Sequence, residues 1–244
     1  MSIDQFIAVA ASIGSCMAAI ATFLTVRQMS KQRTDSYHPE LALSRIVFDA
    51  RPLTDGGLPT LWRTTSNSDS ENIDGTKSPF SFSVPLSNIG LGAAKDVKIF
   101  WEFPLGELTE KINQLAQSAA VAARFTFDNG MLSTDSELFG KQVSIWKNQQ
   151  KAHIDYVLPA AVQHEPETLQ LPHAYVVAAS AFFHMCAKNK NRQSFPELPA
   201  LKVTFNYLDI GDRKHTAAFD IELEVGAFAV GFMQASVVPK KRIA

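Results

Sequence analysis

The chain begins with an apolar stretch that carries no charge. No Asp, Glu, Lys or Arg occurs from residue 6 to residue 26. A helix rises about 1.5 Å per residue, so a helix of this length matches a bilayer core of about 30 Å. The pattern therefore predicts a transmembrane helix over residues 1–27. A buried, Ala-rich helix packed on the rest of the protein is the alternative, because Ser12, Ser15, Thr22 and Thr25 make the stretch only moderately apolar.

The flanks of this stretch predict its orientation. The leading segment carries Asp4, whereas Arg27, Lys31 and Arg33 follow the stretch directly. Positive charge stays on the cytoplasmic side, so we expect a single-pass protein of the cell inner membrane with its N-terminus outside and its C-terminal domain in the cytoplasm. The three cations should contact lipid headgroups. A cleaved signal peptide fits less well, since it has Lys or Arg before its apolar stretch and a small-x-small cleavage site after it.

One face of the predicted span is made of small residues. Ala10, Gly14 and Ala18 lie four residues apart, and Ser15 and Thr22 lie beside them. Small residues at this spacing let two helix backbones approach closely in a membrane. We therefore expect a homo-oligomer that forms through the transmembrane helix. Hydroxyls that bond back to their own helix are the plainer interpretation of the serine and threonine.

After a polar, basic linker at residues 28–39, apolar and polar residues alternate with period two. This alternation predicts half-buried strands. The clearest run from residue 80 to 87, from 97 to 103, from 201 to 207 and from 219 to 225. The last two are joined by Ile210, Gly211, Asp212 and Arg213, which predicts a hairpin. Weaker candidates lie at residues 41–48, 142–146 and 152–158.

Other segments break the alternation. Residues 107–123 have apolar positions at helical spacing, which predicts an amphipathic helix. Residues 172–188 are apolar nearly all round, which fits a helix or a buried strand. Residues 54–78 are rich in Gly, Ser, Asn and Asp, so we expect a long mobile loop with Trp62 as its only large apolar anchor. The fold class is mainly β: a β-sandwich with helical insertions over residues 40–238 and a basic tail at 239–244.

Two turns carry a resemblance. Asn88, Gly90, Gly92, Ala94 and Val97 follow an Asn-x-Gly-x-Gly-x-Ala-x-x-Val pattern, and Leu198-Pro199-Ala200-Leu201 precedes Tyr207-Leu208-Asp209-Ile210-Gly211. The chain resembles uncharacterised bacterial single-pass membrane proteins with a cytoplasmic immunoglobulin-like β-sandwich. Ala93 stands where those proteins usually have proline. The resemblance implies an immunoglobulin-like antiparallel fold and a topology, without an activity, and gives Asn88, Gly90, Gly92, Asp209 and Gly211 the role of structural turn residues.

Composition excludes several classes of protein. The net charge is -1 and the pI about 6.6, whereas nucleic-acid binders usually have a basic domain, so we expect no direct contact with nucleic acid. Only 19% of the residues are charged, which suggests that part of the chain is withdrawn from water. Cys16 and Cys186 are too few for a disulfide framework or a cysteine-based zinc site.

Candidate chemistry is sparse. Gly90-x-Gly92 lacks the third glycine of the dinucleotide fingerprint and precedes a strand, so we interpret it as a turn. His173 and His184 would share a helix face near Cys186, but zinc ligands usually come at i,i+4 or with a convergent carboxylate. We interpret these residues as core or capping side chains. The sequence therefore predicts no catalytic, metal or cofactor-binding residue.

Function follows by elimination. Sandwiches without a polar cleft mostly bind other macromolecules, so the leading hypothesis is a membrane-tethered interaction or sensing module, without catalytic activity, whose partners are membrane lipids and an unknown protein. The alternative is an oligomerising membrane effector of a bacterial anti-phage defence system.

Overall fold

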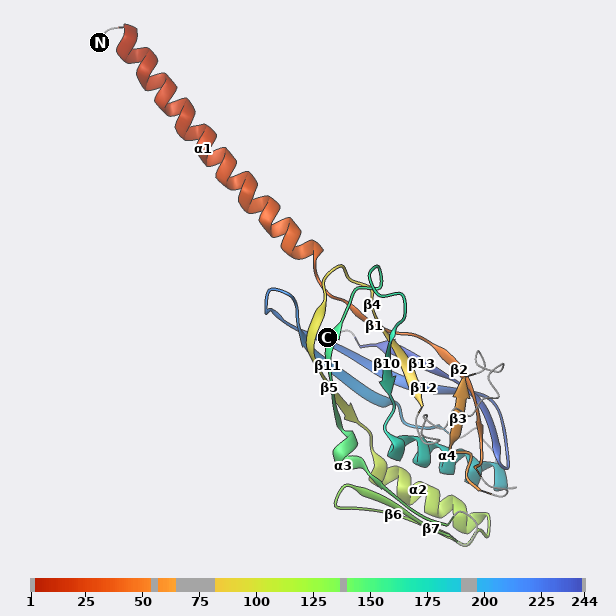
Figure 1. Ribbon diagram of the computed structural model, residues 1–244. Helices are drawn as coiled ribbons and strands as arrows, with labels where there is room; N and C mark the ends of the chain where they lie inside the picture. Colours follow the sequence, from red (N-terminus) through yellow and green to blue (C-terminus); the bar gives the residue numbers. More distant parts are fainter. Residues whose placement is uncertain (1–2, 54–56, 65–81, 137–139, 190–196, 243–244) are drawn as a thin grey trace.

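A computed structural model describes residues 3–53, 57–64, 82–136, 140–189 and 197–242; the side chains at 4–6, 8–10 and 33–36 lie outside that description. Its most prominent feature is the helix α1 (Ile3–Ser36), which projects away from a mainly β domain (Figure 1). Every side chain from residue 11 to residue 32 is exposed. Within the described residues, no helix is long and apolar enough to cross a membrane.

The domain is built on a seven-stranded antiparallel sheet. Its strand order is β3 (Leu61–Thr64), β2 (Ile46–Arg51), β13 (Phe232–Lys241), β12 (Lys214–Ala229), β11 (Leu201–Leu208), β5 (Ala94–Glu102) and β9 (Lys151–Val157). The predicted hairpin is confirmed, because β11 and β12 pair from Leu201 opposite Ile221 to Leu208 opposite Lys214. Alternate residues of these strands are buried, as the period-two pattern requires.

A smaller antiparallel sheet contributes to the same core. It has the order β1 (Leu41–Leu43), β4 (Ser83–Asn88) and β10 (Glu167–Gln170), and its residues Leu41, Val84 and Leu86 are fully buried. The single strand expected at residues 41–48 is two strands. The chain pairs with β4 up to Leu43, as β1, and pairs with β13 from Ile46, as β2. It therefore passes from the smaller sheet to the larger one.

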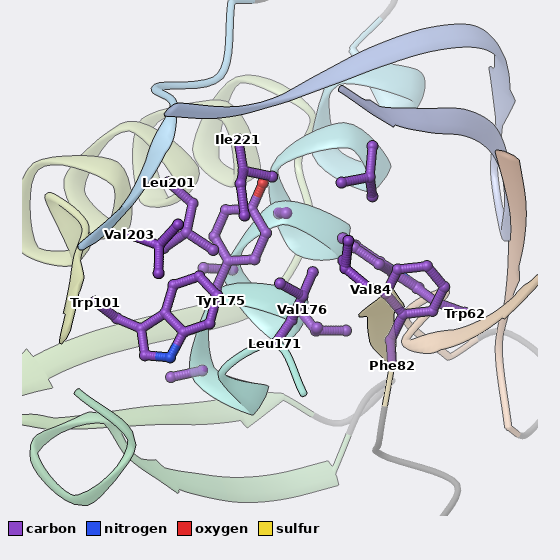
Figure 2. Packing of buried hydrophobic residues seen from close by; sticks show 14 of the residues in the cluster. Trp62, Phe82, Val84, Trp101, Leu171, Tyr175, Val176, Leu201, Val203 and Ile221 are labelled. Atoms are coloured by element: carbon purple, nitrogen blue, oxygen red, sulfur yellow. The ribbon is translucent and has the colours of Figure 1, made fainter. Parts of the chain in front are cut away.

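Helices complete the core. The segment 172–188 is the helix α4 (His173–Lys188), and its residues from Ala174 to Cys186 are all buried. Its Tyr175 lies among large side chains from both sheets (Figure 2), with its ring centroid 4.9 Å from that of Phe103 and 6.2 Å from that of Trp62. A helix that is apolar all round can only be stable when it is enclosed in this way.

The amphipathic helix is confirmed as α2 (Leu105–Ser118), which packs against α4. It ends before the expected residue 123, because Ala120 adopts a left-handed backbone with φ 52° and Val121 N donates to Ala116 O at 2.9 Å. This is a Schellman ending. A third sheet follows, in which β6 (Ala123–Asp128), β7 (Met131–Ser136) and β8 (Gly140–Ile145) are consecutive neighbours; α3 (Trp146–Gln149) comes next.

Two expected boundaries are wrong. The segment 54–78 contains the strand β3, since Trp62 is buried against Phe48 with ring centroids 4.4 Å apart and its Nε1 donates to Ser180 Oγ at 2.9 Å. Residues 54–56 and 65–78 lie outside the described residues. The expected tail is shorter than 239–244, because β13 continues to Lys241 opposite Phe219.

Candidate functional site at the root of the long helix

The residues that the sequence assigns to two structural turns lie together where α1 joins the domain. Residues 37–40, which follow α1, contact the β4–β5 turn that contains Asn88, Gly90 and Gly92, and they also contact the β11–β12 hairpin that contains Asp209 and Gly211. We call residues 37–40 the root of α1. The connection between the exposed helix and the β domain is therefore held by both turns.

Asn88 is the hydrogen-bonding centre of the first turn. Its side chain is buried, and its Oδ1 accepts from Glu40 N at 3.0 Å and from Gly90 N at 3.1 Å. Its Nδ2 donates to Gly92 O at 2.7 Å and to Val157 O at 3.1 Å. One amide thus joins the root, its own turn and the edge strand β9, with all of its donors and at least one acceptor in use.

Gly90 and Gly92 allow the backbone of the root to lie against this turn. A Cβ atom at Gly90 would overlap the carbonyl oxygen of His38 and lie 2.6 Å from Glu40 N; one at Gly92 would overlap the carbonyl oxygen of Tyr37. A turn between two strands often requires glycine for a positive φ, but neither Gly90 nor Gly92 has one. Their role is close approach between two backbone segments.

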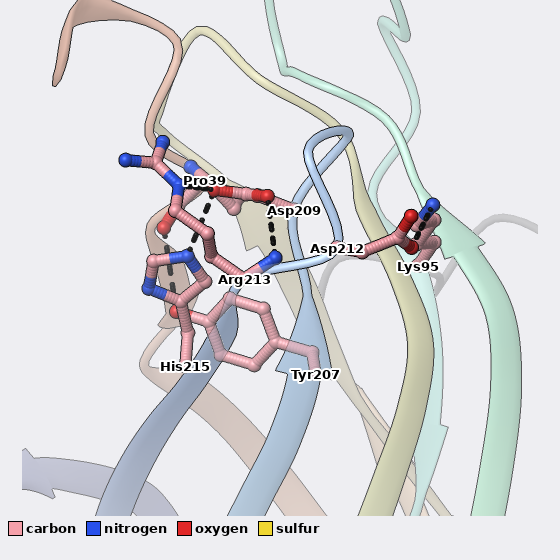
Figure 3. A network of polar contacts seen from close by, with 7 residues as sticks. All are labelled: Pro39, Lys95, Tyr207, Asp209, Asp212, Arg213 and His215. Atoms are coloured by element: carbon pink, nitrogen blue, oxygen red, sulfur yellow. Dashed lines mark hydrogen bonds and ion pairs between the residues drawn. The ribbon is translucent and has the colours of Figure 1, made fainter. Parts of the chain in front are cut away.

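Asp209 is the centre of the second turn (Figure 3). Its buried carboxylate lies 2.7 Å from Arg213 Nε and 3.1 Å from His215 Nε2, and its Oδ1 accepts from Arg213 N at 3.0 Å. Burial alone would raise the pKa of this carboxyl, but the hydrogen bonds and the charge of Arg213 lower the pKa to about 2. Asp209 is therefore ionised at neutral pH and holds the hairpin closed.

This network reaches the root through aromatic residues. The His215 ring lies 4.5 Å from the His38 ring and 5.5 Å from the Tyr207 ring, measured between centroids. Tyr207 Oη donates to Pro39 O at 3.3 Å, and burial raises the pKa of Tyr207. The sequence analysis places Arg213 in the turn without giving it a partner, and it does not name His215. The spacing of Arg213 and His215 from Asp209 could have predicted this network, because residues that follow a hairpin turn can reach a carboxylate that precedes it.

The turn's left-handed residue is Asp212 and not Gly211. Asp212 has φ 61°, and its carboxylate forms an ion pair with Lys95 Nζ at 2.6 Å. A Cβ at Gly211 would lie 3.3 Å from Asp209 Oδ1, so the glycine leaves room for the buried carboxylate. Aspartate tolerates this backbone conformation better than most residues do.

The histidines of α4 have structural contacts. His173 Nδ1 lies 2.7 Å from Ser144 Oγ, which joins β8 to the first turn of α4. His184 is buried, and burial lowers its pKa to about 4, so the ring is neutral at physiological pH. Cys186 is also buried. Among the described residues, no group of three or more His, Cys, Asp or Glu side chains could hold a metal ion.

The residues predicted to act within α1 are exposed where they are described. Gly14 has no atom within 4 Å of the position of an added Cβ, and Ser15 and Thr22 are exposed while donating to Ala11 O and Ala18 O at 2.9 Å. Ala18, Arg27 and Lys31 are exposed as well. The side chains of Ala10 and Arg33 lie outside the description. The hydroxyls are therefore satisfied within their own helix, and the small-residue face is left open.

Comparison with known proteins gives no further assignment. No protein-family model, no curated protein and no solved structure matches this chain.

Proposed function

We propose that the chain is a single-pass inner-membrane protein that holds a cytoplasmic interaction or sensing domain at the bilayer, without catalytic activity of its own. The observation that carries this proposal is the exposure of apolar side chains along α1. Ile13, Met17, Phe23 and Val26 are each more than half exposed on a helix that projects from the domain. Apolar side chains in this number are not stable in water without a partner.

A lipid bilayer is the partner that fits this helix best. The apolar residues are distributed around the helix instead of along one stripe, as expected when all sides meet the same solvent. The uncharged stretch runs from residue 6 to residue 26. The side chains at positions 6 and 8–10 of this stretch lie outside the description. The cations Arg27, Lys31 and Arg33 follow it and would each gain about 1 kcal/mol from anionic lipid on the cytoplasmic side.

The domain supports an interaction or sensing role more than catalysis. Its mainly β architecture has a seven-stranded and a three-stranded sheet whose buried residues share one core, which is consistent with a sandwich, and sandwiches without a polar cleft mostly bind macromolecules. The buried polar groups around Asp209 and Asn88 join backbone segments to one another. Their contacts fix residues 37–40 against the domain. A domain that is held in this way can respond to movement of these residues.

A membrane-insertion assay tests the proposal. Full-length protein should stay with membranes after extraction at alkaline pH, and a reporter active only in the cytoplasm should give signal when fused after Ala244. The double variant Ile13→Lys with Ile20→Lys should release the protein, because each lysine at the centre of a span costs about 3 kcal/mol. Val143→Lys, at an exposed position of β8, is the matched control and should stay bound. Recovery of the unmutated protein in the soluble fraction would refute the anchor.

The open small-residue face of α1 favours a second candidate, an oligomerising membrane effector of an anti-phage defence system. Gly14 and Ala18 are both exposed, and this would let helices pack closely. Crosslinking in membranes should then give ladders, and overexpression should be toxic in a manner that deletion of residues 1–30 abolishes. A monomer in membranes would remove this candidate and leave the tethered module.

A further inference from the structure

The strand β8 is an edge of the third sheet, and its outer face is apolar. Among the described strands, β8 pairs with β7 alone. Val143, in the second half of β8, is 63% exposed. Ile145 and Met131 lie opposite each other on β8 and β7 and are 44% and 42% exposed. An exposed apolar edge strand is a template for pairing with another strand.

The β6–β7 turn determines which backbone groups of β8 point to the free edge. Asn129-Gly130 is a two-residue turn, so the residues that flank it exchange hydrogen bonds, as do alternate pairs along the hairpin. Residues 140, 142 and 144 therefore bond to β7, and the N–H and C=O groups of Lys141 and Val143 point outward. Within the described ranges, no hydrogen bond reaches the outward groups of Val143.

Other edge strands of the protein are protected. The same alternation directs the N–H and C=O groups of Phe125 to the outer edge of β6. Asn113 of α2 closes that edge, because its Nδ2 donates to Phe125 O at 2.7 Å and its Oδ1 accepts from Phe125 N at 2.9 Å. The edge strand β9 exposes Lys151 and Asp155, and charged side chains disfavour strand pairing. Among the described residues, no side chain closes the edge at Val143 in the way that Asn113 closes β6.

We propose that β8 pairs with β8 of a second copy of the chain, antiparallel and centred on Val143, an inference that rests on the proposed anchoring of the copies in one membrane. The two Val143 residues then face each other and exchange both N–H···O bonds. Lys141 of each copy lies opposite Ile145 of the other. Parallel pairing in register would instead place the two Lys141 side chains next to each other, and like charges destabilise a cross-strand pair. The charge of β8 thus favours the antiparallel arrangement.

This arrangement suits two helices that enter one membrane. The third sheet and α1 lie at opposite ends of the domain, with α2 packed against β6 and α4 (Figure 1). The buried Phe125 and Leu132 mark the inner face of the sheet, which is turned toward the rest of the domain. Two antiparallel strands of one continuous sheet are related by a two-fold axis perpendicular to the sheet. Rotation about that axis keeps both α1 helices on the same side of the shared sheet.

The pairing should need copies that are held together. A single pair of short strands is marginally stable in water, and β8 has six residues. Copies that share a membrane, and above all copies whose α1 helices associate, have a raised effective concentration. We therefore expect the pairing in membranes and not in dilute detergent. Separation of the α1 helices should weaken it as well.

Disulfide trapping in proteoliposomes tests the pairing with the full-length chain. Cys16→Ser removes the exposed thiol of α1, and Cys186 is buried, so this background should stay monomeric on mild oxidation with copper phenanthroline. Val143→Cys should then form an inter-chain disulfide at least about fivefold faster than Val162→Cys, an equally exposed valine in the loop after β9. Facing residues of a hydrogen-bonded antiparallel pair have Cα atoms about 5.5 Å apart, which a disulfide can span.

Two further variants test the register. Lys141→Cys in one copy and Ile145→Cys in a copy with a longer tag should form the mixed disulfide in preference to either like pair. Val143→Pro removes the N–H that would donate to the second copy and leaves the bonds to β7 in place, so it should lower the mixed disulfide at least about fivefold. Unchanged tryptophan fluorescence shows that this variant is folded. A predominance of like pairs, or a mixed disulfide unaffected by the folded proline variant, would overturn the arrangement.

The outcomes separate the pairing from the anchor. Equal trapping rates at residues 143 and 162 in protein that resists alkaline extraction would overturn the pairing and leave the anchor intact. Preferential trapping at residue 143 in protein that alkaline extraction releases would overturn the anchor and support the pairing. A Val143→Cys thiol that is shielded from maleimide in cell membranes, yet forms no disulfide with its own copy, would overturn the second copy as the partner and assign the edge to a strand of another protein.

Discussion

One methyl group added at Gly92 tests how the domain holds the root of α1. In Gly92→Ala the new Cβ would overlap the carbonyl oxygen of Tyr37 and lie 2.9 Å from its carbonyl carbon. Both are backbone atoms, which cannot rotate away as a flexible side chain can. Overpacking usually costs about 1–3 kcal/mol, so we expect a loss near 3 kcal/mol in the free energy of unfolding. In a domain of this size, that loss lowers Tm by about 6–12 °C.

Tryptophan fluorescence during thermal unfolding of the full-length chain in mild detergent measures this change. Trp62, Trp101 and Trp146 are all buried in the β domain, so the signal reports the domain and not α1. Gly106→Ala is the matched control, because its Cβ would lie 3.7 Å from Phe127 and alanine favours the helix α2 by about 1 kcal/mol. If Gly92→Ala is as stable as the unmutated chain while Gly106→Ala gains stability, the close approach at the root is not a packing constraint.

Three further measurements probe the core, the turn and the helix. Asn88→Ala should cost about 3 kcal/mol in unfolding experiments, since it leaves buried backbone groups without their hydrogen bonds, and an unchanged midpoint would contradict the role of this amide. His184 has a pKa of about 4 in the fold against 6.5 when exposed, so unfolding takes up a proton; stability should fall by up to about 3 kcal/mol as pH drops from 6.5 to 4, and His184→Gln should flatten that slope. In membranes, Gly14→Leu should reduce crosslinked ladders to monomer, whereas Leu24→Ile should leave them unchanged.

The strands that alternate strictly could be predicted from the sequence, and those governed by distant contacts could not. Residues 201–225 show clear alternation and a turn, and they form the hairpin of β11 and β12. The hairpin of β6 and β7 was missed, although Asn129 and Gly130 form its turn with φ 52° and 75°. Asn-Gly is a strong hairpin signal, because both residues tolerate positive φ. The Asn129-Gly130 dipeptide is therefore the local signal in the sequence that marks this hairpin.

The sequence predicts the two turns of the candidate site, but it does not predict which residues these turns contact. Asn88, Gly90 and Gly92 have the composition of a turn, and this composition does not reveal that Glu40 is their partner. The bond from Tyr207 Oη to Pro39 O joins residues 168 positions apart, and no local pattern encodes that pairing. The glycines were therefore recognised for their backbone, while the reason for them, close packing against the root of α1, depends on the tertiary fold.

The way the root is held has a consequence for how a tether could act on its domain. Flexible linkers separate the orientation of an anchor from that of its domain. Here residues 37–40 are held by backbone contacts to one turn and by side-chain contacts to another. A displacement of residues 37–40 must then move both turns or break contacts that stabilise the fold. Under the proposed function, helix association in the membrane would raise the local concentration of the β domain, and any part of the motion that reaches residues 37–40 would be passed to both turns, because these residues are held by the domain.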